Sequence, residues 1–265
     1  MKGGLKIGFP AGLLEDSPVR LDVPLCREGA FVVLDKPSGV YLEADGIAEN
    51  PKTIIGGIKA QEGKPELERL GVSFPSAVFA ADPEISGLCL VASNRDSAVP
   101  LRNAFGSGLF GFEFVILSER PLAAVNPEVS LPLLRHSEKP RTVVSHRFGK
   151  KCSTSFALIE DLGDYQLWSA KTSFLRWHQI RIHAAEAGLR PVGEDTYVRV
   201  RKLFLSRLMR KGFVKKGDDE RPVYDAPAYH LAKISFPFDG QKYEASAPLP
   251  KKFELMLKKI RASLE

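Results

Sequence analysis

Two segments of the sequence carry side chains whose types and spacing could do chemistry. In FAADPEISGLCLVAS, residues 79–93, Asp82 stands before Pro83 and a run of apolar residues. Pro83 restricts the backbone after the aspartate and Gly87 permits unusual backbone angles, so we expect Asp82 in a turn just before a strand. A carboxylate held there can project into a cleft. Its local composition is also typical of an ordinary turn, because Asp before Pro is common turn chemistry.

The second segment, FLRWHQIRIHAAEAG, gathers polar groups around Ile180 and Ile182. These groups are Arg176, His178, Gln179, Arg181 and His183. Alternation along a strand or a first helical turn predicts that Gln179, Arg181 and His183 share one polar surface. The two histidines are five positions apart and no acid or Cys completes a ligand set, so no metal site is predicted. Each histidine could equally be a structural, hydrogen-bonded group.

Short apolar runs bounded by Gly, Pro or Asp predict the strands that must position these segments. The runs begin near residues 31, 76, 109, 141, 153, 164, 229 and 241. The Ala-rich stretch 178–188, ending at Gly188, predicts a helix. Because strands outnumber helices and often follow one another directly, we predict an α+β fold, with a mixed, largely antiparallel sheet flanked by helices and loops.

Length and composition indicate one compact globular unit. Hydrophobic residues make up 44% and charged residues 26% of the 265 positions, which excludes disordered and fibrous classes. Residues 1–24 are rich in Gly and Pro and are expected to form an irregular arm. The three cysteines have no paired spacing, so we predict no disulfide and a reducing compartment. Without a signal-peptide core or a stretch of roughly 18 uncharged residues, we expect a cytoplasmic monomer that does not bind membranes.

The balance of charge favours a polyanionic partner. The chain carries 38 Lys and Arg against 32 Asp and Glu, and residues 199–216 hold eight cations and no acid. Apolar residues within this run recur at helical spacing, which predicts a helix whose basic face could neutralise phosphates. Arg207, Arg210 and Lys211 are the candidate contacts. The alternative is a solvated helix whose charges only confer solubility.

Four collinear segments resemble those of the RluA-class pseudouridine synthases. Asp82 with SGLCLVAS, followed by RWHQIRIH, is similar to the two signature segments of that family. VVLDKPSGV, from Val32, resembles its opening strand and Lys-Pro-x-Gly turn, and residues 228–250 resemble its closing strands. The resemblance implies that residues 25–265 form a catalytic domain of this fold. It also implies an isomerase that converts uridine to pseudouridine in structured RNA, such as rRNA or tRNA, with no cofactor or metal.

The resemblance further implies roles for individual residues. Asp82 matches the catalytic aspartate, Arg181 the arginine that pairs with it, and Phe112 the position of a tyrosine that stacks on the target base. Ile180 resembles the apolar residue on the other side of that pocket. Substrate contacts are expected from Lys36, Arg176, His178 and Gln179. A close Asp82–Arg181 pair beneath Phe112 in an open basic cleft is the geometry that would support catalysis.

The segment around Asp82 also departs from the family pattern. Residues 79–81 are Phe-Ala-Ala where the family has His-Arg-Leu, residues 83–85 are Pro-Glu-Ile where it has Arg-Asp-Thr, and Phe110 replaces a Lys. Two functions therefore stay open. Joint retention of Asp82, Arg181 and an aromatic residue at 112 favours an active, divergent synthase, whereas the altered segment favours a catalytically silent RNA-binding protein. A protein-interaction scaffold is a third possibility, but it would leave the basic run without a polyanion to bind.

Overall fold

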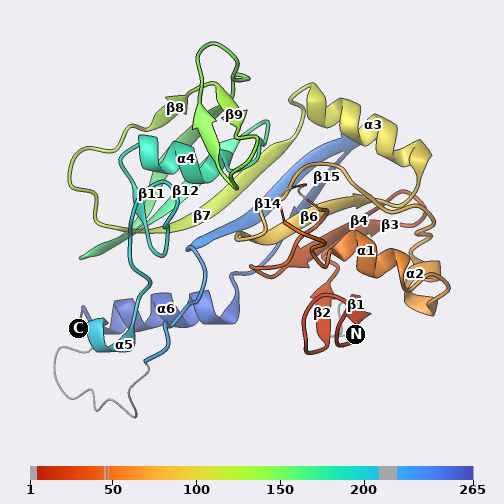
Figure 1. The fold of residues 1–265 in the computed structure, drawn as a ribbon, viewed down its shortest axis with the longest axis horizontal. Helices are drawn as coiled ribbons and strands as arrows, with labels where there is room; N and C mark the ends of the chain where they lie inside the picture. The colour runs from red at the N-terminus through yellow and green to blue at the C-terminus, as the bar shows by residue number, and fades with distance from the viewer. Residues whose placement is uncertain (1–4, 45, 47, 209–219, 265) are drawn as a thin grey trace.

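The computed structural model describes residues 5–44, 46, 48–208 and 220–264, and a twisted sheet dominates it (Figure 1). The strands of this sheet are β3 (Leu25–Arg27), β4 (Phe31–Lys36), β5 (Ser76–Ala77), β6 (Ser86–Ala92), β7 (Gly111–Glu119), β8 (Glu128–Ser130), β11 (Ser153–Leu162), β12 (Tyr165–Thr172), β13 (Arg190–Pro191), β14 (Tyr229–Phe238) and β15 (Gln241–Ser246).

The pair of β6 and β14 lies in the middle of the sheet and connects its two halves. The strands run β3-β4-β6-β14-β7-β12-β11-β8, with β5, β13 and β15 attached to β6, β7 and β14 respectively. Within the described residues, β6 and β14 pair in parallel and the remaining pairs of this sheet are antiparallel. The predicted α+β class and the largely antiparallel sheet are confirmed.

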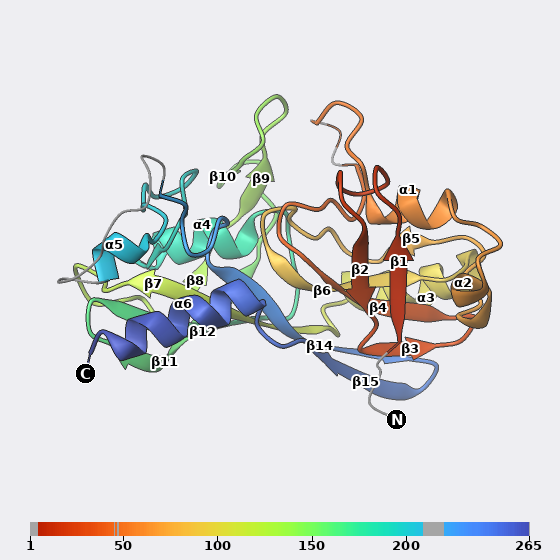
Figure 2. The same ribbon diagram turned by 90° about the horizontal axis from the view of Figure 1, so that it is seen from below.

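Helices cover both faces of the sheet, because its strands alternate side chains between two apolar cores. On the front face, defined by Phe112 and Phe114, α3 (Arg95–Gly106) and α4 (Gln179–Glu186) pack on one continuous core. The back face carries α1 (Ile54–Lys59) and α2 (Pro65–Arg69) at one end and α6 (Lys251–Ala262) at the other, as Figure 2 shows from below. None of the described helices combines the length and apolar character needed to cross a bilayer.

The expectation of an irregular arm over residues 1–24 was wrong. Strands β1 (Lys6–Phe9) and β2 (Val19–Asp22) form an antiparallel hairpin. Ile7, Phe9 and Leu21 are each no more than 2% exposed and pack in the core that contains α1. The hairpin forms because these alternate apolar side chains cover α1, a tertiary contact that the Gly and Pro content of the segment conceals.

The expected basic helix over residues 199–216 is also largely wrong where it can be assessed. Only α5 (Leu205–Leu208) is helical within the described part of that run. Val200 and Leu203 are buried, and the Val200 and Leu203 backbones bond to Glu194 and Val223, so this stretch follows the core surface instead of coiling. Arg210 and Lys211 lie outside the described residues.

A further hairpin, β9 (Leu133–Arg135) with β10 (Thr142–Val144), stands above the sheet beside α4 (Figure 1). Strand β10 contacts α4, and the backbone N–H of Thr142 donates to the Tyr197 hydroxyl at 2.7 Å. The hairpin is therefore anchored at its base on the front face of the sheet.

Gly87, at the start of β6, is the tightest point of the central strand pair and yields a stability prediction. Its φ is +113°, and a Cβ there would lie 2.3 Å from the Leu231 carbonyl oxygen of β14. We expect Gly87→Ala to lower the free energy of unfolding by about 2–4 kcal/mol. Gly8→Ala is the control, because nothing lies within 4 Å of its Cβ position, and it should change stability by at most about 0.5 kcal/mol. Urea denaturation of both variants measures the difference, and equal midpoints would contradict the prediction.

Candidate active site

Asp82 lies in the predicted place, in a loop that leads into β6. Asp82 is 8% exposed, and its Oδ1 accepts a hydrogen bond from the backbone N–H of His178 at 2.9 Å. The next residue, Pro83, is clamped through its carbonyl, which accepts from Lys36 Nζ at 3.0 Å and from the Gly39 N–H at 2.7 Å. The loop is thus fixed from both sides, and the carboxylate has little freedom to move.

Lys36, which we expected to contact substrate, faces the underside of this loop. The residue is 2% exposed, and Nζ donates to the carbonyls of Pro83 and Pro37. Burial lowers the pKa of Lys36 to about 8, although nearby acidic groups oppose that shift. In this position the ammonium supports the backbone next to Asp82.

His178 provides the hydrogen bond to Asp82 because of an unusual backbone conformation. It precedes α4 with φ of +58°, in the left-handed region that non-glycine residues rarely adopt. Its ring is fully buried, with Nδ1 2.8 Å from the Tyr197 hydroxyl and its face stacked on Trp177. The backbone N–H of Thr142 also donates to the Tyr197 oxygen, so this hydroxyl links β10 to the His178 ring.

Arg181 does not form the direct pair with Asp82 that the family resemblance implied. It makes a buried, bidentate pair with Glu194, with Nε–Oε2 and Nη2–Oε1 distances of 2.9 Å. Nη1 approaches Glu84 Oε2 at 3.3 Å and His178 Nε2 at 3.3 Å. The guanidinium therefore reaches Asp82 only through its longer-range charge, and the Asp82 loop meets Arg181 through Glu84.

The two carboxylates of the loop experience opposite shifts of their pKa. Burial raises the pKa of Asp82, and the Glu84 charge adds to that effect, while His178 and Arg181 oppose it. For Glu84, burial acts to raise the pKa, but the interactions with His178 and the charge of Arg181 outweigh it and lower the pKa to about 2. Glu84 is consequently ionised at any ordinary pH, whereas Asp82 is the carboxylate that titrates unusually high.

Helical geometry separates the polar residues that strand-like alternation grouped together. Gln179 and His183 lie one turn apart and both contact Thr154, through Gln179 Nε2 at 3.2 Å and His183 Nδ1 at 2.9 Å. Arg181 points elsewhere, toward Glu194. The single polar surface expected for these residues was wrong, because α4 turns by about 100° per residue.

The other expected substrate contacts lie in different environments. Gln179 is fully buried and its amide bonds to Ser153, Thr172 and Arg176 backbone or hydroxyl groups. Arg176 is half-buried and donates to the Lys151 carbonyl. Arg207 sits on α5, on the α6 side of the molecule, and pairs with Glu119 at 3.0 Å (Figure 1). Gln179 and Arg176 therefore stay in the segment that holds His178, whereas Arg207 lies on a different element.

Phe112 and Ile180 are both buried in the front core. Phe112 is 2% exposed, and Phe79 packs edge-on against it with ring centroids 5.0 Å apart. Phe105 and Phe110 complete the cluster around Phe112. The aromatic face that the resemblance offers to a base is therefore covered by Phe79, which occupies the position of the family's histidine.

Two spaces meet at the Asp82 loop. A void of about 20 Å³ lies beside Asp82 and is walled by Phe79, Ile85 and Phe114 among others. This is room for a single water and not for a pyrimidine base. Outside the loop is an open cleft of about 310 Å³, lined by Ala80, Pro83 and Trp177 among others. Phe79 and Ala81 line both spaces and so form the partition between them.

Sequence reasoning missed the acidic and phenolic groups that organise the site. Glu194 is fully buried and accepts from Arg181 and from the Tyr229 hydroxyl at 3.2 Å. Tyr197 bridges Thr142 and His178, and burial raises its pKa to about 12. The run Gly-Glu-Asp-Thr-Tyr at 193–197, acidic within a basic chain and close behind a helix, is the signal that could have found them. Within the described residues, no cluster of three or more His, Cys, Asp or Glu could hold a metal ion.

No family model matches the chain, but curated relatives align with most of its length. It is 24% identical over 255 residues to an uncharacterized RNA pseudouridine synthase of Chlorobaculum parvum, which covers 93% of this chain and 76% of the relative. It is 22% identical over 276 residues to ribosomal large subunit pseudouridine synthase D of Haemophilus ducreyi, which covers 99% and 79% respectively.

Solved structures show a similar fold. Human RNA pseudouridylate synthase domain containing 4 superposes with a TM-score of 0.65 at 14% identity, over 90% of this chain and 92% of that one. Human RNA pseudouridylate synthase domain containing 1 gives a TM-score of 0.59 at 18% identity, over 91% and 95%. The shared fold, the four collinear segments and the relatives agree, and together they support an RluA-class pseudouridine synthase.

Proposed function

We propose that this protein isomerises uridine to pseudouridine in RNA, with Asp82 acting on the target nucleotide. The observation that carries the proposal is the Asp82 carboxylate, which is nearly buried, is held by the His178 N–H and lines a small void behind the wall of an open cleft. In the reaction the bond from C1′ to N1 breaks, the uracil turns, and C1′ bonds to C5; C5 then loses its proton and N1 gains one, so that product and substrate are isomers. One carboxylate, acting as nucleophile or as a base on the sugar, could suffice.

The proposal extends to partner and setting. Several relatives are named for the large ribosomal subunit, which favours ribosomal RNA over transfer RNA. Because the isomerisation involves no redox change or group transfer, we infer that no cofactor or metal takes part. Cys26, Cys89 and Cys152 are free thiols, which fits a reducing cytoplasm, and we retain a monomer as the expected state.

Entry of the base requires one side chain to move. The void beside Asp82 is too small for uracil, but Phe79 and Ala81 line both this void and the outer cleft. Rotation of the Phe79 ring away from Phe112 would join the two spaces and expose an aromatic face. A base that enters can then replace the Phe79 contact with its own stacking on Phe112, which offsets part of the cost of flipping.

The second candidate is a catalytically silent RNA-binding protein, and two features of the Asp82 site favour it. The void at Asp82 holds about 20 Å³, and the Arg181–Asp82 pair is indirect. Such a protein would bind RNA with an affinity that falls steeply with salt, and it would yield no pseudouridine under any condition.

Asp82→Asn separates these two functions. Asn can still accept the His178 N–H but is neither a nucleophile nor a base, so we expect pseudouridine formation to fall at least about 10³-fold while RNA affinity stays within about twofold. The measurement is pseudouridine mapping on RNA from cells that lack the gene, after incubation with wild type or variant. Asp225→Asn, at a side chain that is 72% exposed, is the control and should leave activity unchanged. If no uridine depends on Asp82, the silent function replaces the proposed one.

The pH profile tests whether ionised Asp82 is the active form. Because the pKa of Asp82 is raised, activity should increase with pH through an acid limb above the ordinary value of 3.8. Glu84→Gln removes a negative charge that raises this pKa, so the limb should move to lower pH. Glu244→Gln, at a side chain that is 67% exposed on the back of the sheet, should not move it. A limb that stays in place in Glu84→Gln, measured as kcat/KM, would rule out the assigned electrostatics.

Variants of Arg181 separate two effects of this residue: the stability that comes from its pair with Glu194, and the effect of its charge on the pKa of Asp82. Arg181→Gln leaves the buried Glu194 without its partner and should cost about 3–5 kcal/mol of stability. The double variant Arg181→Gln with Glu194→Gln removes that unpaired charge and should recover most of the loss. Because the Arg181 charge lowers the pKa of Asp82, the acid limb of the folded double variant should lie at higher pH than that of wild type. A double variant as unstable as the single one would contradict the pairing.

A further inference from the structure

The outer cleft beside the Asp82 loop contains a column of three stacked planar groups. The Trp177 ring lies on the His178 imidazole with centroids 3.8 Å apart and an angle of 22°. The Arg135 guanidinium carbon lies 4.3 Å from the Trp177 ring centroid. Since the imidazole occupies one face of the indole at that distance, the guanidinium covers the other. The column thus runs from buried His178, through half-buried Trp177, to exposed Arg135.

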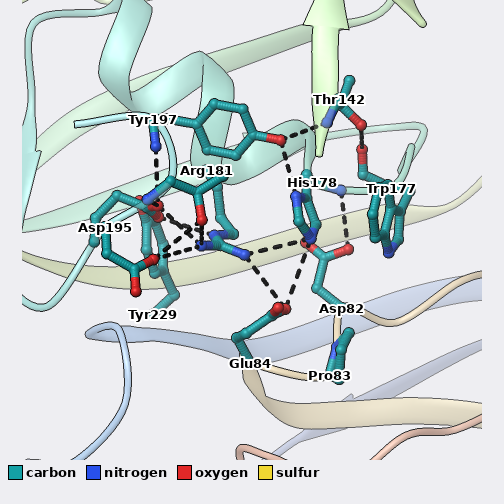
Figure 3. Close-up of polar contacts among 12 residues, drawn as sticks. Asp82, Pro83, Glu84, Thr142, Trp177, His178, Arg181, Asp195, Tyr197 and Tyr229 are labelled. Atoms are coloured by element: carbon teal, nitrogen blue, oxygen red, sulfur yellow. Dashed lines mark hydrogen bonds and ion pairs between the residues drawn. The ribbon is translucent and has the colours of Figure 1, made fainter. Parts of the chain in front are cut away.

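The column joins two elements that lie far apart in the sequence. Arg135 ends β9, whereas Trp177 precedes α4, and the Thr142 hydroxyl of β10 donates to the Trp177 carbonyl at 2.8 Å. Figure 3 shows Trp177 beside His178 and Asp82, with Thr142 above it. The stack is therefore fixed at its buried end and open to the cleft at its Arg135 end.

Small side chains leave room in front of the column. The cleft of about 310 Å³ is lined by Arg135 and Trp177 together with Ala80, Ala81 and Pro83. The two alanines are next to Asp82 in sequence, so a planar group stacked in this cleft would lie next to the position of the target nucleotide. An unpaired base fits this description, because every base has a π-face that stacks on aromatic rings or guanidinium planes.

The segment that carries Arg135 has the charge that an RNA backbone requires. Residues 133–151 contain six Lys and Arg and a single acid, Glu138. Lys139, Arg141, Lys150 and Lys151 are exposed. On the same segment, Arg147 lies 4.8 Å from the ring of Phe148, which is 64% exposed. Cations interleaved with exposed aromatic groups are the usual composition of a single-strand binding surface.

We propose that the Arg135–Trp177 column is a stacking site for one unpaired base of the substrate RNA, next to the nucleotide that Asp82 receives. The proposal rests on the proposed function in taking RNA as the substrate. Arg135 and Trp177 act here as positioning residues. They hold the neighbouring base out of the RNA stack while the Asp82 loop, residues 79–82, opens. The sequence places a tryptophan in this segment next to His178, and the stacking site gives that large side chain a function.

Tryptophan fluorescence tests the stacking, because a base that stacks on the outer face of the Arg135 guanidinium or takes its place changes the surroundings of the Trp177 indole. The chain has two tryptophans, so Trp168→Phe leaves Trp177 as the sole reporter. Titration of this protein with a 12-mer of oligouridylate should quench its emission, and a 12-base-pair RNA duplex should quench it much less. In Trp177→Phe the remaining Trp168, which is 9% exposed in the core, should respond to neither RNA and serves as the matched control. Equal responses of the two reporters would overturn the proposal.

Affinity measurements complete the test without any turnover. Trp177→Leu should weaken binding of the oligouridylate about 5- to 100-fold, the range expected for loss of one stacked base, and duplex binding less than about twofold. Arg135→Gln does not touch His178 and should also weaken single-strand binding while lowering the salt slope by about one cation. If both variants bind the single strand as wild type does, the stacking site does not exist.

The outcomes keep the two proposals apart. A protein that forms pseudouridine but shows no Trp177 quenching would overturn the stacking site alone. A protein whose Trp177 is quenched by single-stranded RNA but that forms no pseudouridine would overturn the proposed activity and leave the stacking site intact.

Discussion

The buried pair of Arg181 and Glu194 is the interaction on which the site depends. Neither residue exposes more than 1% of its side chain, so each charge would be strongly unfavourable without the other. The bidentate contact fixes α4 against residues 193–197, and the same turn brings Tyr197 to His178. With its ring held in this way, His178 keeps a left-handed backbone and points its N–H at Asp82. The position of the His178 N–H beside Asp82 thus follows from one buried ion pair.

The fold could be predicted from the sequence wherever strands carry their own signal. Strands β4, β6, β7 and β12 are short apolar runs between turn residues, and they form where those runs predict them. Elements whose stability comes from distant contacts were missed. The β1–β2 hairpin depends on burial of Phe9 beneath α1, and α3 carries Pro100 inside it, a residue that argues against a helix. Residues 199–204 hold a helical spacing that the burial of Val200 and Leu203 overrides.

The sequence predicted which residues lie together in the site better than it predicted the contacts between them. Asp82, His178 and Arg181 do lie together, because collinear resemblance locates residues along a chain. It does not locate partners: the choice of Glu194 over Asp82 for Arg181 depends on the rotation of α4, and the His178 N–H bond depends on a backbone angle. Neither is encoded in side-chain types. Burial is likewise invisible in the pattern, so Lys36 and Phe112 were expected to contact the substrate although each is 2% exposed.

The altered residues around Asp82 have matched partners, and this bears on whether the segment drifted. Glu84 faces Arg181 at 3.3 Å, the Pro83 carbonyl accepts from Lys36, and Phe79 packs edge-on against Phe112. Ala80 and Ala81 open the cleft in front of Trp177 and Arg135. Random loss of function would relax such pairings independently, because nothing would select one change to suit another. A segment in which the charged substitution and the aromatic substitution each meet a complementary group is better explained as a remodelled site than as a drifting one.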